Sequence, residues 1–198
     1  MFVQIIQGRT SDQDGLRKQT EAWQRDIQPG ADGYLGGTFG VTDDGQFLGF
    51  ARFASEEAAR SNSDRPEQGS WWDETSKLFE GEVTFHDCNE VVEMGSGGSD
   101  DAGFVQVIQG RTDDMTALRA AGEEAGQGTA RPDVIGGYSA VHGDDPNAFT
   151  TVVYFTSEEE ARAGESNPDF QADQSANQMQ ELMKDVHFYD LRNPWMTS

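Results

Sequence analysis

The chain has 198 residues, 35% of them hydrophobic, which suits one or two globular domains and excludes a disordered chain. Fourteen Lys and Arg residues against 36 Asp and Glu residues give a formal net charge of −22. A surface this acidic repels phosphate backbones and anionic lipids, so we expect neither a nucleic acid nor a membrane as partner. The sequence also lacks the patterns of a membrane span and of a signal peptide, so a cytoplasmic location is expected.

One nine-residue segment occurs twice. Residues 2–10 read FVQIIQGRT and residues 104–112 read FVQVIQGRT, which differ at one position. A second pair of segments, Ser55–Arg60 and Ser157–Arg162, matches at five of six positions. Repetition of this quality at a fixed spacing indicates a tandem duplication.

The first half alternates between strand and helix patterns. Unbroken or alternating apolar residues predict strands, and apolar residues at every third or fourth position predict helices. The expected elements are a strand at 2–7, a helix from Ser11 or Asp12 to Pro29, strands at 34–41 and 46–53 joined by a turn at 42–45, a helix from Ser55 interrupted at 62–69, and a strand at 82–88. This β-α-β-β-α-β order predicts a ferredoxin-like fold, an antiparallel sheet with both helices on one face.

The second half repeats this order after a stretch rich in Gly, Ser and Asp. We therefore expect a ferredoxin-like half at 1–92, a linker at 93–103 and a second half at 104–198. The pairs Gly36-Gly37 and Gly136-Gly137 predict a bulge in the second strand of each half. Each half leaves one sheet face bare, and packing the two bare faces together predicts an α+β barrel closed within one chain. The expected assembly is a monomeric pseudo-dimer or a higher homo-oligomer.

In its duplication, its element order and its repeated Ser-Glu-Glu-x-Ala-Arg segment, the chain resembles the dimeric α+β barrel superfamily. The resemblance is to the antibiotic-biosynthesis-monooxygenase-like and stress-responsive families, in which two ferredoxin-like subunits pair through their sheets. It implies a pocket between helices and sheet in each half, which in the superfamily takes small hydrophobic aromatics, polyketides or haem. It also implies that an oxygenase of this type needs no metal or flavin and holds its substrate with a few polar residues.

The segment between the two helical stretches of the first half supplies the first candidate residues. Asn62, Arg65, Trp71 and Trp72 occur there, and the second half has neither the tryptophans nor the arginine at the matching place. In the functional interpretation, the two tryptophans form the aromatic side of a ligand pocket, and Arg65 or Asn62 supplies the polar group that binds the ligand. In the structural interpretation, paired tryptophans at the start of a helix pack into the hydrophobic core.

Two strand residues complete the candidate site. His86 points away from the side on which Phe85 lies, and it is either a general base or haem ligand or a hydrogen-bonded structural residue. Arg52, on the strand at 46–53, is expected to reach the same cavity. If the first half holds the working pocket, Trp71, Trp72, Arg65 and His86 should converge on it.

Metal ligands are scarce in this sequence. Cys88 is the one cysteine, and the histidines are His86, His142 and His187. These residues exclude an internal disulfide and a cysteine-based metal cluster. We expect neither a metal nor an organic cofactor.

Two functions stay open at this point. One is a cofactor-independent, monooxygenase-like enzyme that acts on a hydrophobic or aromatic small molecule. The other is a non-catalytic ligand-binding or stress-related barrel protein. The divergence of the halves at Trp71, Trp72 and His86 favours an enzyme, whereas the lack of an activated residue pair favours the alternative.

Overall fold

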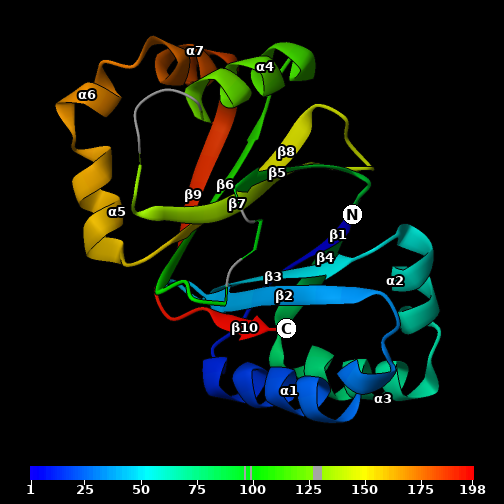
Figure 1. The fold of residues 1–198 in the computed structure, drawn as a ribbon. Helices are drawn as coiled ribbons and strands as arrows, with labels where there is room; N and C mark the ends of the chain where they lie inside the picture. The colour runs from blue at the N-terminus through cyan, green and yellow to red at the C-terminus, as the bar shows by residue number, and fades with distance from the viewer. Residues whose placement is uncertain (96, 99, 127–130) are drawn as a thin grey trace. The chain divides into compact units, whose positions relative to one another are not determined.

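The computed structural model describes residues 1–95, 97–98, 100–126 and 131–198, apart from the side chain of Phe170. The chain forms two compact units (Figure 1). The first consists of residues 1–91 and 193–198, and the second of residues 92–192. None of the described helices is long and apolar enough to cross a lipid bilayer.

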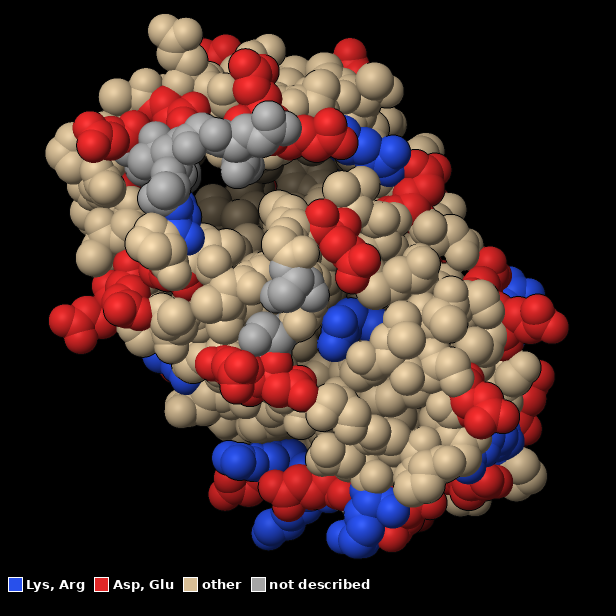
Figure 2. Space-filling model, viewed as in Figure 1, with Lys and Arg blue, Asp and Glu red and all other residues tan. Residues whose placement is uncertain are grey.

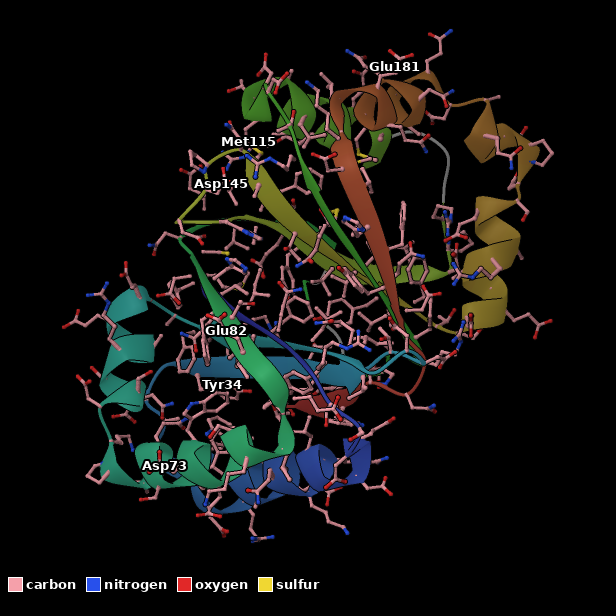
Figure 3. The ribbon with its side chains drawn as sticks, turned by 180° about the vertical axis from the view of Figure 1, so that it is seen from behind. Tyr34, Asp73, Glu82, Met115, Asp145 and Glu181 are labelled. Carbon is pink, nitrogen blue, oxygen red and sulfur yellow. The ribbon has the colours of Figure 1, made fainter. Side chains whose placement is uncertain are left out.

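The first unit is one antiparallel sheet with helices on one face. The strand order is β10-β2-β3-β1-β4. Its elements are β1 (Phe2–Arg9), α1 (Gln13–Asp26), a 3-10 turn (Gln28–Gly30), β2 (Tyr34–Val41), β3 (Gln46–Phe53), α2 (Glu56–Ser63), α3 (Pro66–Thr75), a second 3-10 turn (Ser76–Leu78), β4 (Glu80–Cys88) and β10 (Trp195–Thr197). Figures 1 and 3 show α1 and α3 side by side beneath the sheet.

The second unit repeats this plan with the strand order β5-β7-β8-β6-β9. Its elements are β5 (Glu90–Gly95), β6 (Phe104–Arg111), α4 (Met115–Gly126), β7 (Val134–Val141), β8 (Ala148–Phe155), α5 (Glu158–Glu165), α6 (Pro168–Gln171), α7 (Gln174–Leu182) and β9 (Lys184–Leu191). The predicted α+β class with two ferredoxin-like halves is confirmed.

Two edge strands lie outside the predicted plan. β5 occupies part of the segment expected to be a linker, of which residues 96 and 99 lie outside the described residues, and it pairs with β7. β10 follows the second half in sequence but pairs with β2 of the first unit, with Trp195 opposite Phe39. The structural boundaries therefore differ from the predicted ones: residues 193–198 belong to the first unit because their backbone completes its sheet.

Local chemistry explains where the elements start and bend. Asp12 caps α1 and Ser55 caps α2 by accepting hydrogen bonds from backbone N–H groups of the first turn. Pro66 opens α3 and ends the helical run before it, as the sequence predicted. Gly36 adopts a φ of 118° where the β2–β3 register shifts, which confirms the bulge and explains the glycine.

The register assigns every strand residue of the first sheet to one of two faces. Ile6 and Phe47 face the helices, where they form a core with Leu16 and Trp195. Ile5 and its cross-strand neighbour Phe50 point to the opposite face. Since side chains alternate along each strand, this parity decides which candidate residues can share a pocket.

Candidate functional site

Arg65 ties two connections of the first unit together. Its Nη1 donates to the backbone oxygen of Ile27, at the end of α1, and to Oδ1 of Asn62, both at 3.0 Å. Its Nε and Nη2 donate to one carboxylate oxygen of Glu67 at 3.1 and 2.7 Å. Every nitrogen of this guanidinium is therefore bonded to protein, which favours the structural role.

The indole of Trp71 is likewise bonded within the unit. Its Nε1 donates to the backbone oxygen of Gln19 at 2.8 Å, and Trp23 Nε1 donates to Oε1 of Gln68 at 2.6 Å. Both bonds join α3 to α1. Trp72, by contrast, makes ring contacts with its aromatic neighbours, among them Phe79 at a centroid distance of 6.1 Å.

His86 lies on the other face of the sheet from the tryptophans. It pairs with Ile5, whose side chain points away from the helices, while Phe85 pairs with helix-facing Ile6. The Phe85 ring accordingly contacts Trp72 at a centroid distance of 5.2 Å. The predicted convergence of His86 with Trp71, Trp72 and Arg65 is therefore wrong, because neighbouring strand residues point to opposite faces.

Arg52 also points away from the helices, since it pairs with Val3. Its Nε is buried without a hydrogen-bond partner among the described residues, and its Nη2 lies close over Gly36. The six candidates thus divide into four on the helix side, Asn62, Arg65, Trp71 and Trp72, and two on the opposite face, Arg52 and His86. Their part in binding stays a prediction.

The helix-facing layer of the first unit is filled by its own aromatic side chains. Phe47 contacts Phe79 at 5.2 Å and Trp195 at 6.4 Å between ring centroids. Phe39 and Trp72 pack against the same cluster. The predicted first-half cavity is thus occupied by side chains in this structure.

The corresponding layer of the second unit is more open. Phe188 occupies the position of Phe85, and it is 61% exposed where Phe85 is 43% exposed; α7 has no aromatic residue, whereas α3 places Trp72 against Phe85. Figures 1 and 3 show α4 and α7 side by side, and the thioether of Met179 on α7 lies beside Gly122 of α4. The two helices therefore pack on each other while the sheet residue Phe188 stays uncovered.

Two hydroxyl groups, those of Ser139 and Thr151, lie on the helix-facing side of the second sheet. We call this side of the sheet the floor. Thr151 Oγ1 donates to Ser139 Oγ at 3.0 Å. Their counterparts in the first unit are Gly49 and Phe39, which also lie opposite each other. Replacing a phenyl ring and a glycine by two hydroxyls turns an apolar packing surface into one that can bond a polar atom of a ligand.

A cavity of about 370 Å³ lies beside α5, and Phe188, Ser139 and Thr151 are not among its described lining residues. Figure 2 shows a hollow in the surface of the second unit. The described residues that line the cavity are Arg131, Pro132, Asp133, Thr156, Glu160, Ala163, Gly164 and Asn167. Its size falls in the range of small-molecule pockets.

Arg131 is one of three charged residues among the described residues that line this cavity. It is paired with Asp133 at 2.7 Å, and its guanidinium lies over the ring of Phe155. Burial alone would raise the pKa of Asp133, but the hydrogen bonds from Arg131 and from the backbone hold that pKa below its usual value. Asp133 is thus an ionised partner of Arg131.

A second arginine, Arg162, joins α5 to the edge strand β9. Arg162 on α5 pairs with Asp190 of β9 and lies over the ring of Phe104. Asp190 in turn accepts a bond from Gln106 Nε2 at 3.3 Å. These contacts hold α5 against β9. Gln106 lies on the same face as Ile108 and is bonded to Asp190, whereas the hydroxyls of Ser139 and Thr151 bond each other.

The sequence held a signal for this second-unit floor that the prediction did not use. Aligning the repeats puts Ser139 against Phe39 and Thr151 against Gly49. The pairing of the two positions across neighbouring strands became evident only from the strand register. Within either unit taken alone, the described side chains bring together no group of three His, Cys, Asp or Glu ligand atoms.

Comparison with known proteins defines the class of fold. A "putative monooxygenase" from Lactobacillus acidophilus aligns with a TM-score of 0.74 and 15% identity, covering 100% of this chain and 99% of that one. A "putative monooxygenase" from Fusobacterium nucleatum gives a TM-score of 0.80 at 9% identity, covering 100% and 94%. An "anthrone oxidase-like protein" gives 0.69 at 11% identity, covering 100% and 93%.

No protein-family model matches the sequence, and no curated protein matches it significantly. At these identities the structural matches establish the fold and leave the reaction open. The matches therefore confirm the predicted fold, two ferredoxin-like halves in one chain.

Proposed function

We propose that the protein binds a small hydrophobic, aromatic molecule in the helix-facing layer of its second unit and acts on it as a cofactor-independent monooxygenase. The observation that carries this proposal is the uncovered ring of Phe188 on the same face as the Thr151–Ser139 hydroxyl pair. An apolar surface with a few polar groups is what such ligands require. The whole-chain likeness to proteins described as monooxygenases supports the reaction class.

In this proposal the apolar and the polar residues of the layer have different roles. The Phe188 ring offers a stacking surface, and the two hydroxyls orient a phenolic or carbonyl oxygen of the substrate. In a reaction of this type the substrate itself supplies the electrons that activate oxygen, so the protein's part is to bind, orient and exclude water. The proposal moves the working pocket from the first half, where we expected it, to the second.

A matched pair of variants tests the site. F188A removes a side chain that is 61% exposed, so we expect the unfolding temperature to stay nearly unchanged while ligand binding falls at least about tenfold. F85A, its counterpart in the first unit, removes a ring packed on Trp72 and should lower the unfolding temperature while leaving binding in the second unit intact.

Calorimetric titration with dihydroxynaphthalenes, followed by oxygen-electrode measurements, supplies the two readouts. Oxygen uptake that depends on Phe188 and Thr151 supports the enzyme. Equal binding by F188A and the unaltered protein contradicts the site.

The alternative function is ligand binding without turnover. It is favoured by the hydroxyl pair itself, since Ser139 and Thr151 bond each other. Binding that requires Phe188 but gives no oxygen uptake would select it.

A further inference from the structure

The cavity beside α5 lies at a place that small side chains close in the first unit. Aligned by strand register and by the repeated segment, the residues there are Gly33, Ala54 and Ala58 in the first unit and Asp133, Thr156 and Glu160 in the second. The backbone confirms the alignment, because in both units the residue after β3 or β8 donates to the residue before β2 or β7, at 2.7 and 3.0 Å. A Cβ added to Gly33 would lie 2.9 Å from the Cβ of Ala58, so only a glycine fits beside that methyl group. The second unit has polar residues at all three positions, and all three line the cavity.

Glu160 carries the net charge of the cavity lining. The other charged residues among the described lining residues are Arg131 and Asp133. These two pair with each other at 2.7 Å, and their side chains are 14% and 8% exposed, so their charges cancel and the pair fixes one side of the cavity. Oε2 of Glu160 accepts a bond from the hydroxyl of Thr156, but its Oε1 has no hydrogen-bond or ion-pair partner among the described residues. The described lining therefore presents one negative charge in excess.

The remaining lining groups suit a small organic cation. Ala163 and Gly164 belong to the last turn of α5, where the backbone carbonyl groups carry a partial negative charge. Pro132 and the methyl group of Ala163 add apolar surface. A volume of about 370 Å³ lies near the lower end of the range of ligand pockets, which limits the occupant to a small molecule. A carboxylate, a helix C-terminus and an apolar surface together favour a cation with an aliphatic part over an anion.

We propose that this cavity binds a primary alkylammonium compound, whose ammonium group pairs with Glu160 and whose alkyl chain lies against Pro132 and Ala163. An ammonium group has three N–H donors, so it can bond the second carboxylate oxygen while Thr156 keeps its bond to the first. The first unit lacks this anionic partner, because Ala58 stands at the position of Glu160. The proposal is independent of the aromatic site proposed above, whose residues are not among those described as lining the cavity.

Two probes of nearly equal length, pentylamine and pentanol, separate the effect of the charge from that of the alkyl chain. At about pH 7 pentylamine is a cation, as a lysine side chain is, and pentanol is neutral. Titrations followed by the backbone amide resonances of the cavity residues give both dissociation constants. E160Q, whose amide oxygen can still accept from Thr156, should weaken pentylamine about fivefold, the effect of one partly exposed ion pair, and leave pentanol unchanged. The proposal is overturned if pentylamine does not bind, if E160Q leaves it unchanged, or if E160Q weakens both probes equally.

E159Q is the matched control for charge. Glu159 is the neighbouring residue of α5, is exposed and is not among the described lining residues, so E159Q changes the net charge equally and leaves the cavity lining intact. We expect pentylamine to bind E159Q as it binds the unaltered protein. An equal loss in E159Q would mean that the charge of the whole molecule attracts the amine, and would overturn the site.

Two further variants test the location. A163L extends a side chain into the cavity and should weaken both probes, because the alkyl chain loses its space. F188A should leave pentylamine binding unchanged, since Phe188 is not among the described lining residues. Unchanged binding by A163L, or a loss in F188A, would overturn the proposed location.

Discussion

In each unit an arginine joins the segment before β2 or β7 to the helical region after β3 or β8. Arg65 belongs to the helical region and extends to the segment, whereas Arg131 belongs to the segment and extends to the helix. Arg65 extends from the α2–α3 junction to the backbone oxygen of Ile27, at the end of α1. Arg131 extends from the segment before β7 to the backbone oxygen of Ala161 on α5. Each lies over a glycine of the part it reaches, Gly30 in the first unit and Gly164 in the second. The absence of an arginine at the second-half position of Arg65 is thus explained by a structural exchange and not by the loss of a site.

This exchange predicts a loss of stability in two separate variants. R65A and R131A should each lower the free energy of unfolding by about 2 kcal/mol, because each leaves a backbone acceptor and a charged partner unsatisfied. R25A is the matched control, since Arg25 pairs with Asp26 at the exposed surface and should cost nothing measurable. Chemical denaturation gives the three values. An R65A protein as stable as R25A would return Arg65 to the list of ligand anchors.

At the scale of elements, the sequence predicted the helices and the long strands because their apolar periodicity is local information. The helix interruption at 62–69, where Pro66 lies, and the bulge at Gly36-Gly37 were predicted correctly for the same reason, since each acts through its own backbone. β10 was missed because a three-residue strand has no period to detect, and its place is set by pairing with β2 far away in sequence. The predicted convergence of the candidate site was wrong for a related reason. Alternation along the strand already put His86 and Phe85 on opposite faces, but the strand register was needed to show which face the helices cover.

The edge strand β10 gives an element-scale prediction. A fragment of residues 1–92 lacks Trp195, a core residue of the first unit, and leaves the edge of β2 unpaired. We expect this fragment to dimerise or aggregate. Joining residues 193–198 to it through a Gly/Ser linker should raise its unfolding temperature, and the same graft carrying W195A should recover less of that gain. Light scattering and thermal unfolding check both expectations, and a stable soluble monomer of residues 1–92 alone would contradict them.

At the scale of the whole molecule, charge sets the dependence of stability on salt. The excess of 36 acidic over 14 basic residues leaves −22 charges to repel one another in the compact state. Figure 2 shows acidic side chains distributed over the visible face of the protein. Several ion pairs among the described residues are exposed, such as Arg17–Glu21 and Lys77–Glu74, and contribute little that salt could remove. Added salt should therefore weaken the repulsion among the excess negative charges more than it weakens the attraction within ion pairs.

Raising NaCl from about 0.1 M to about 1 M shortens the Debye length from about 10 Å to about 3 Å. We expect this change to stabilise the protein by on the order of 1 kcal/mol at pH 7, about 2–4 °C in unfolding temperature for a chain of this length. The control is the same titration near pH 4.2, the isoelectric point, where the net repulsion is absent and the gain should vanish. A salt response of equal size at both pH values would mean that general salting-out, and not charge repulsion, limits the stability of the folded chain.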